Sequence, residues 1–256
     1  MMNDETTGIK SDETLLAIIE ELKRLSGANL ATLDSNLDVS KSTIHRHLAT
    51  LKKHDYLNQR GDTYYLGLRF LDIGGKVRRN PYYKIVQPRT KELAEETGEI
   101  AQFIVEDHGM GVFVYREWAE NTVWTNARVG KRVHLHCTAA GKAILSAMPA
   151  VRVEEIVAEY GLPAYTDHTI TECDELKAEL EAVRQRGYAY EMGDYTDGLW
   201  AVGAPVDGPN DETLGALSVA GPTHKFKDEW FDETLPEVLL RIINEAELDI
   251  TYSRRD

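Results

Sequence analysis

The chain has 256 residues, of which 42% are hydrophobic and 28% are charged. This composition excludes an intrinsically disordered chain, and the length suits one or two domains. The 43 acidic residues outnumber the 29 basic residues, and the resulting formal net charge of −14 excludes a general binder of polyanions.

The sequence also predicts that the protein is neither a membrane protein nor a secreted protein. The longest stretch without a charged residue, Thr213 to His224, has twelve residues, whereas a membrane-spanning helix needs about 20. The acidic, polar start of the chain does not resemble a secretory signal peptide. Two cysteines, Cys137 and Cys173, exclude a disulfide-rich scaffold. We therefore expect a cytoplasmic protein without a membrane partner.

The acidic charge is concentrated in the second part of the chain. Residues 1–80 hold 12 basic and 11 acidic side chains, whereas residues 81–256 hold 17 and 32. Residues 41–60 are locally basic, and such a face can bind DNA even in an acidic protein. Two explanations for the excess of acidic residues remain open. One is solubility alone, and the other is life in high salt, as in a halophilic archaeon.

Two short helices are predicted at the start of the chain. Apolar residues recur at helical spacing over residues 15–25, with Ser11 as the expected N-cap and Gly27 as the expected stop. A second short helix fits residues 30–37. This pattern gives the first helix a single apolar stripe.

A third helix is expected to begin after Ser40, which can cap it. Ile44, Leu48 and Leu51 share one face and predict its buried side. The opposite face is polar and basic, and small hydroxyls at its start allow close approach to a DNA backbone. The residues predicted to contact DNA from this face are Lys41, Ser42, Thr43, His45 and Arg46.

A hairpin is predicted directly after the third helix. Strand-like runs at residues 56–57 and 64–66 flank Arg60-Gly61-Asp62, which is typical hairpin-turn chemistry. Three short helices followed by a hairpin predict a winged helix-turn-helix, with Arg60 of the wing as a further DNA contact. The alternative is a small helical packing domain with a solvated charged face.

A linker helix is predicted after the wing. Leu68, Leu71 and Gly75 fall along one helical face, and residues 78–81 break the pattern. The predicted organisation is a winged helix-turn-helix at residues 1–67, a linker helix at residues 68–80 and a second domain at residues 81–256.

The second domain mixes helices and strands. His108-Gly109 suits a hairpin turn between its first two strands. Strands are predicted at residues 100–105, 111–115, 123–127, 188–191, 199–206 and 214–219. Helices are predicted at residues 83–97, 141–148, 151–160, 176–187 and 238–248. This mixture predicts an α+β fold whose second domain is an α/β domain with a mainly antiparallel sheet.

Residues 134–143 are the most informative part of the second domain. Ala139, Ala140 and Gly141 stand at the start of a predicted helix, where free backbone N–H groups can bind a carboxylate or a phosphate. The alternative is tight helix–sheet packing, which also needs small residues. The segment is not a Walker A loop, because His136 stands where the first Gly would be.

Metal and enzyme readings are weaker alternatives. His134, His136 and Cys137 could hold zinc with Cys173, but no CxxC or HExxH pattern accompanies them. On a strand, the two histidines would face one side and Cys137 the other, so Cys137 has no adjacent base. Ser218 lies outside a G-x-S-x-G elbow. We therefore expect no metal, no cofactor and no enzyme activity.

These motifs, taken in order, resemble the IclR family of transcriptional regulators. The similarity spans roughly residues 11–250. It is carried by residues 41–51, 64–67, 136–143, 186–189, 198–206 and 215–222. It implies a GAF-like effector-binding domain, linker helices that pair the subunits, and a palindromic double-stranded DNA operator bound by a homodimer or a dimer of dimers.

The resemblance also implies a pocket for a small organic effector, often a carboxylate or an aromatic compound, and we expect it to be a metabolite of a catabolic pathway. By position, the pocket would be formed by Val133, Ala139, Ala140, Glu191, Leu199, Ala201 and Ser218. Family members that bind small acids often have Ser or Cys where this chain has Ala201 and Ala220. Asp194 lies close to Glu191, and the two carboxylates would disfavour an anion unless one of them points away or is paired, so a neutral or aromatic effector is an alternative. The alternative function is a small-molecule-binding module that does not bind DNA.

Overall fold

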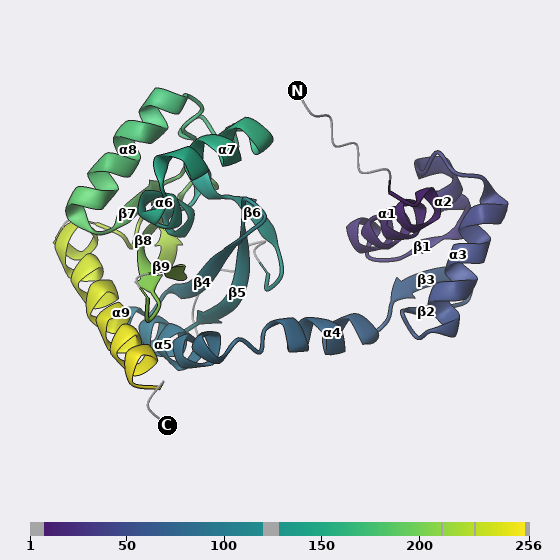
Figure 1. Ribbon diagram of the computed structural model, residues 1–256, viewed down its shortest axis with the longest axis horizontal. Helices are drawn as coiled ribbons and strands as arrows, with labels where there is room; N and C mark the ends of the chain where they lie inside the picture. Colours follow the sequence, from purple (N-terminus) through teal and green to yellow (C-terminus); the bar gives the residue numbers. More distant parts are fainter. Residues whose placement is uncertain (1–7, 120–127, 211, 228, 254–256) are drawn as a thin grey trace. The chain divides into compact units, whose positions relative to one another are not determined.

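The computed structural model describes residues 8–119, 128–210, 212–227 and 229–253. The chain divides into two compact units between Arg79 and Asn80 (Figure 1). Each unit has its own hydrophobic core. The predicted strand at residues 123–127 lies outside the described residues. Within the described ranges, no helix has both the length and the apolar character needed to cross a bilayer.

The first unit is a winged helix-turn-helix followed by one further helix, as the sequence predicts. Its small sheet is antiparallel, with the strand order β1-β3-β2. The helices are α1 (Lys10–Leu25), α2 (Leu30–Asn36), α3 (Lys41–Lys53) and α4 (Arg69–Val77), and the strands are β1 (Ala28–Asn29), β2 (Leu57–Arg60) and β3 (Thr63–Leu66).

The core of the first unit follows from the apolar stripes of its helices. Ile18 and Leu22 of α1 are buried in one cluster with Ile44 and Leu48 of α3. Ser40 caps α3, as predicted, by accepting a hydrogen bond from the Thr43 backbone N–H at 3.3 Å.

The predicted N-cap of α1 is wrong. The helix starts at Lys10, one residue before Ser11, and Ile9 in the capping position makes no side-chain hydrogen bond. The Ser11 hydroxyl donates to the Asp12 carboxylate at 3.2 Å instead. The predicted stop is confirmed, because Ser26 adopts a left-handed conformation and the Gly27 N–H closes the last turn on the Leu22 carbonyl at 3.0 Å.

The second unit is built on an antiparallel sheet, as predicted. Within the described residues, the strand order is β6-β5-β4-β9-β8-β7, and all neighbouring strands are antiparallel. The strands are β4 (Ile100–Asp107), β5 (Met110–Trp118), β6 (Arg132–His134), β7 (Ala189–Met192), β8 (Leu199–Asp207) and β9 (Thr213–Pro222).

Helices cover both faces of this sheet (Figure 1). Phe103 and Leu217 point to the face covered by α5 and α9, whereas Ile104 and Ala216 point to the face covered by α6. Successive strand residues alternate between the two faces. Both faces are covered by helices, so apolar residues on both sides of the central strands are buried. The helices are α5 (Pro81–Thr97), α6 (Ala139–Ala147), α7 (Ala150–Tyr160), α8 (Cys173–Arg186) and α9 (Leu235–Tyr252), with short turns η1 (Leu135–Cys137) and η2 (Trp230–Thr234).

The start of α6 lies directly against β8. A Cβ at Gly203 would lie 2.6 Å from the Ala140 nitrogen and 2.7 Å from the Ala139 carbonyl carbon. Thr138 caps α6 by accepting a hydrogen bond from the Gly141 N–H at 3.0 Å. The small residues at positions 139 and 140 therefore serve close helix–sheet packing, which is the alternative that the sequence left open.

Candidate functional site

The residues predicted to contact DNA lie on the side of α3 that faces away from the core. Thr43 is half-buried, and its hydroxyl lies 2.9 Å from the hydroxyl of the capping residue Ser40. The other predicted contacts on α3 are exposed, and they are Lys41, Ser42, His45 and Arg46. The helix therefore presents one continuous polar side.

The basic side chains of this surface and of the wing are not paired with carboxylates in the described residues. Within the described ranges, no ion pair involves Lys41, Arg46 or Arg60. By contrast, Arg24 of α1 pairs with Glu21 at 2.6 Å. The guanidinium of Arg60 lies 5.6 Å from the ring centroid of Tyr65 in the wing. An uncommitted cation can meet a phosphate or a base edge without losing an internal ion pair.

A groove of about 610 Å³ lies between the start of α1 and α3. Hydroxyl and cationic side chains dominate its walls, which suits contact with a phosphate backbone. The residues that line it are Lys10, Ser11, Thr14, Asp38, Val39, Ser40, Thr43, Arg46, His47 and Thr50.

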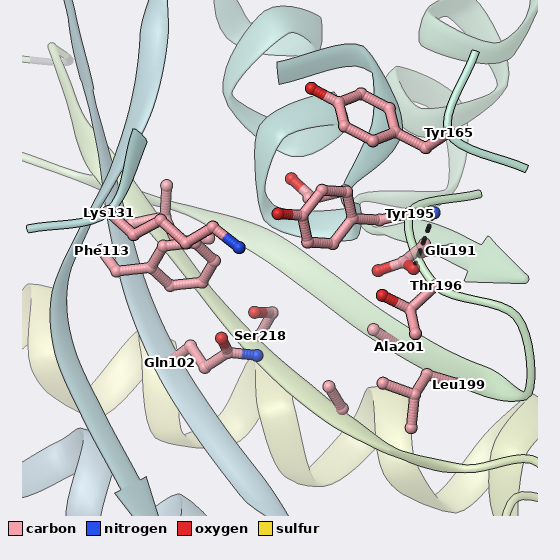
Figure 2. A pocket seen from close by; sticks show the side chains of 13 residues that line it. Gln102, Phe113, Lys131, Tyr165, Glu191, Tyr195, Thr196, Leu199, Ala201 and Ser218 are labelled. Atoms are coloured by element: carbon pink, nitrogen blue, oxygen red, sulfur yellow. Dashed lines mark hydrogen bonds between the residues drawn. The ribbon is translucent and has the colours of Figure 1, made fainter. Parts of the chain in front are cut away.

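The second unit contains a cavity on the α6 side of its sheet (Figure 2). Its volume is about 230 Å³, below the usual lower limit of about 300 Å³ for small-molecule sites, so it suits a small ligand. We call it the effector cavity. It is lined by Gln102, Ile104, Phe113, Lys131, Thr138, Tyr165, Glu191, Tyr195, Thr196, Leu199, Ala201, Ser218 and Ala220.

Strand register brings the floor of the effector cavity together. Gln102 of β4 stands opposite Ser218 of β9. Ala201 of β8 stands opposite both Glu191 of β7 and Ala220 of β9. Because residues two apart share a face, Ser218 and Ala220 both point into the cavity. A polar pair from β4 and β9 therefore lies beside a row made of Glu191 and two alanines.

The electrostatics of the cavity are dominated by Glu191. Burial, reinforced by the nearby Asp194 carboxylate, raises the pKa of Glu191 to about 8, so this carboxyl is largely protonated at neutral pH. Its Oε1 accepts a hydrogen bond from the Tyr195 backbone N–H at 3.2 Å. Asp194 is ion-paired, because its Oδ2 lies 2.6 Å from the Nζ of buried Lys142. Glu191 is therefore the acid that remains without a cation.

A loop between α7 and α8 covers part of the cavity. The Tyr165 hydroxyl lies 2.5 Å from Nδ1 of His134. Thr169 donates a hydrogen bond to the Asp194 carbonyl at 2.6 Å, and Thr166 donates one to the Gly193 carbonyl at 2.8 Å. These bonds hold the ring of Tyr165 at the wall of the cavity.

The zinc reading of His134, His136 and Cys137 finds no support in the geometry. The strand ends at His134, and residues 135–137 form a short 3-10 turn, so the expected alternation of a strand does not continue. Nε2 of His136 lies 3.2 Å from the Pro163 carbonyl, and the Cys137 thiol donates to the His134 carbonyl. In the part of the chain that is described, no three His, Cys, Asp or Glu side chains converge as metal ligands.

The predicted effector residues fall into two groups. Glu191, Leu199, Ala201 and Ser218 line the cavity. The other three do not line it. Val133 is buried in the core between the sheet and α6, while Ala139 and Ala140 are pressed against β8 at Gly203. These three residues are therefore not among those that line the cavity, and binding of an anion by the Ala139 and Ala140 N–H groups stays a prediction.

Sequence reasoning missed most of the remaining lining residues. The period-two alternation of β4 could have identified Gln102 and Ile104. No local pattern points to Lys131 or Tyr165, because both lie outside the strands' regular repeat and reach the cavity only through the tertiary fold. The missed residues are Gln102, Ile104, Phe113, Lys131, Thr138, Tyr165, Tyr195 and Thr196.

Comparison with known proteins agrees with this architecture. Residues 15–61 match the sequence model of a family described as the IclR helix-turn-helix domain. Residues 76–242 match a second family, described as bacterial transcriptional regulator IclR C-terminal. The chain belongs to the IclR family of transcriptional regulators. As an IclR-family regulator, it combines a DNA-binding helix-turn-helix with a C-terminal effector-binding domain.

Individual relatives extend the match over nearly the whole regulator. This chain is 30% identical to the probable HTH-type transcriptional regulator ArcR of Halobacterium salinarum, and the alignment covers 96% of this chain and 95% of the relative. The crystal structure of Thermotoga maritima IclR is 26% identical, with a TM-score of 0.77 and coverage of 94% and 99%.

A third relative has the same fold and holds a ligand. It is an IclR homolog from Microbacterium hydrocarbonoxydans complexed with 4-hydroxybenzoate, which is 21% identical with a TM-score of 0.77 and coverage of 92% and 98%. At this identity the similarity concerns the fold alone. The relatives named as regulators are not enzymes.

Proposed function

We propose that this IclR-family protein regulates transcription by binding a palindromic operator through α3 and the wing, under the control of a small organic metabolite of a catabolic pathway. The observation that carries the metabolite part is the effector cavity. Gln102 and Ser218 face it and are buried, and their side chains have no hydrogen-bond partner among the described residues. Buried polar groups are normally hydrogen-bonded, so these two groups suit a ligand.

A palindromic operator requires a symmetric protein, and α4 supports pairing of subunits. Leu68, Leu71 and Val77 on or next to this helix are 79%, 72% and 77% exposed. Several large apolar side chains exposed along one short helix are consistent with an interaction site. We propose a homodimer or a dimer of dimers. The effector would act by binding more tightly to one of two arrangements with different affinity for the operator.

The remaining parts of the proposal follow from this role. A regulator that binds duplex DNA belongs in the cytoplasm. Catalysis is not part of the proposed function, because no base is hydrogen-bonded to Ser218 among the described residues. Origin in a halophilic archaeon is supported by the net charge of −14 and by the relative from Halobacterium salinarum.

Binding of the purified protein to the DNA upstream of its own gene tests the proposal. We expect a gel shift at lower protein concentration than with shuffled DNA of the same composition, and a gradual loss of the shift as salt rises. Equal affinity for both DNA molecules, or no binding to either, would favour a ligand-binding module without a DNA function. Addition of a metabolite that fills the cavity should change the operator affinity.

A further inference from the structure

One acidic and one basic side chain line opposite walls of the effector cavity. Figure 2 shows the Glu191 carboxyl and the Lys131 ammonium pointing into the same space from opposite sides. Glu191 lies on β7, and Lys131 immediately precedes β6 at the other edge of the sheet. The proposed function requires only that some small organic molecule bind here. The chemistry of the two walls restricts that molecule further.

The Glu191 wall lacks a cation of its own. The nearest buried ammonium, Lys142 on α6, is committed to Asp194 at 2.6 Å and lies 3.9 Å from Glu179 on α8. Cys137 also faces this carboxyl, but burial raises the pKa of its thiol, which stays neutral. Tyr195 offers a backbone N–H and Ala201, on the neighbouring strand, offers no polar side-chain atom. A ligand ammonium would give Glu191 the missing partner.

The Lys131 wall has the opposite composition. In the ranges that the structure describes, Lys131 forms no ion pair, and its Nζ lies 5.2 Å from the ring centroid of Tyr195. Gln102 and Ser218 stand opposite each other on β4 and β9 and face the same cavity. A cation together with an amide and a hydroxyl is a suitable set of donors for a carboxylate.

The space between these walls is apolar. Ile104, Phe113 and Leu199 line it, together with the ring of Tyr165. A short hydrocarbon chain or a single ring fits a cavity of about 230 Å³. A ligand ammonium would stabilise the ionised form of the buried Glu191 carboxyl, and a ligand carboxylate would pair with Lys131, which forms no ion pair among the described residues.

We propose that the effector is a small zwitterion, with a protonated amine that pairs with Glu191 and a carboxylate that pairs with Lys131, joined by a short apolar skeleton. The chemical class is that of an α-amino acid or a close analogue. This inference rests on the proposed function, because it takes the effector cavity as the regulatory site.

The experiment compares ligands that share a skeleton and differ in charge. One set is L-phenylalanine, 3-phenylpropanoate and 2-phenylethylamine, and the other is L-leucine, 4-methylpentanoate and 3-methylbutylamine. Thermal melting of the full chain reports binding through the rise in Tm. We expect at least one amino acid to raise Tm more than its two singly charged analogues. An equal or larger rise with a monoacid or an amine, or no rise with any of the six compounds, would overturn the proposal.

Two variants connect the result to the walls of the cavity. Glu191→Gln keeps the size of the side chain and removes its charge, so the amino acid should bind about tenfold more weakly or worse while the monoacid is unaffected. Lys131→Met should weaken the amino acid and the monoacid alike. Glu181→Gln, an exposed residue of α8 that pairs with Arg184, is the control and should change neither affinity. Unchanged amino-acid binding in Glu191→Gln would contradict the proposal.

Proton release gives a readout that misfolding cannot imitate. Because burial keeps Glu191 largely protonated at neutral pH, pairing with an ammonium should release close to one proton per ligand bound. Titration calorimetry in two buffers of different ionisation enthalpy measures this number. Proton uptake, or no proton exchange, would contradict an ammonium at Glu191.

The gel shift with the upstream DNA separates this proposal from the proposed function. If the amino acid binds as expected but the DNA does not, the regulatory role fails and the ligand class stands. If the DNA binds and only a monoacid changes its affinity, the regulatory role stands and the zwitterion is rejected.

Discussion

Arg46 lies on the exposed side of α3 and has no acidic partner among the described residues, whereas Arg24 of α1 pairs with Glu21. We expect Arg46→Ala to weaken operator binding by about 1–3 kcal/mol, because it removes a contact to a base edge or a phosphate. Fluorescence anisotropy with a labelled operator measures the change.

The matched control for Arg46 is Arg24→Ala, which removes an exposed arginine already held by a carboxylate. It should leave operator affinity nearly unchanged. If both variants bind the operator as the wild type does, α3 does not contact the DNA in the way that its exposed side suggests. Loss of affinity on specific and shuffled DNA alike would indicate a phosphate contact for Arg46 rather than a base contact.

Glu191 makes stability depend on pH. Its pKa is about 8 in the folded protein, against 4.5 for an unperturbed glutamate, so the folded state binds the extra proton between these values. The contribution of Glu191 to the free energy of unfolding is therefore fully present below its pKa in the unfolded chain. This contribution is lost as the pH rises through its pKa in the folded protein. Between about pH 5.5 and about pH 8.5, the free energy of unfolding should fall by up to about 3 kcal/mol on this account.

Urea unfolding of the wild type and of Glu191→Gln at both pH values isolates this effect. The glutamine variant should lose clearly less stability on going to the higher pH, because its amide does not titrate. Parallel pH profiles for the two proteins would mean that Glu191 ionises in the folded state as readily as in the unfolded chain.

At the scale of elements, the contact between α6 and β8 depends on Gly203. Gly203→Ala would place a Cβ against the backbone of Ala139 and Ala140, and a backbone cannot move aside as a flexible side chain can. We expect a loss of about 1–3 kcal/mol in the free energy of unfolding, measured by chemical denaturation. Gly74→Ala on α4 meets no atom within 4 Å and should be neutral or slightly stabilising. Equal stability of both variants would contradict the close packing.

The exposed apolar residues of α4 predict a role in pairing of subunits. Leu71→Asp should raise the dissociation constant of the dimer about tenfold or more, because a charge would replace a large apolar side chain at the interface. Light scattering after size-exclusion chromatography, over a range of concentrations, gives the oligomeric state. A dimer of unchanged stability would exclude α4 from the interface.

At the scale of the whole molecule, the acidic charge is the distinctive feature. The excess of 43 acidic over 29 basic residues implies repulsion that salt relieves. We expect Tm to rise with KCl and to continue rising above about 1 M, where simple screening has a range of only about 3 Å. Differential scanning calorimetry measures the trend. A Tm that levels off at low salt would favour solubility as the reason for the acidity.

The sequence alone determined the order and type of most elements. Period-3.6 stripes such as that of α1, the Ser40 cap and the turn chemistry around Gly61 act within a few residues, so they can be read locally. The winged helix-turn-helix and the antiparallel sheet were predicted for this reason. Errors of one residue at helix ends, as at Ser11, arise because several nearby residues can close the first turn.

The lining of the effector cavity was decided only by the tertiary structure. Glu191, Lys131 and Ser218 are far apart in the chain. The pairing of β7, β8 and β9 brings Glu191 near Ser218, and the pairing of β9, β4, β5 and β6 brings Lys131 to the same space. The small residues at the start of α6 are typical of an anion site, and only the tertiary structure shows that the backbone there lies directly against Gly203. Local patterns encode secondary structure, whereas long-range pairing decides which side chains face a common cavity.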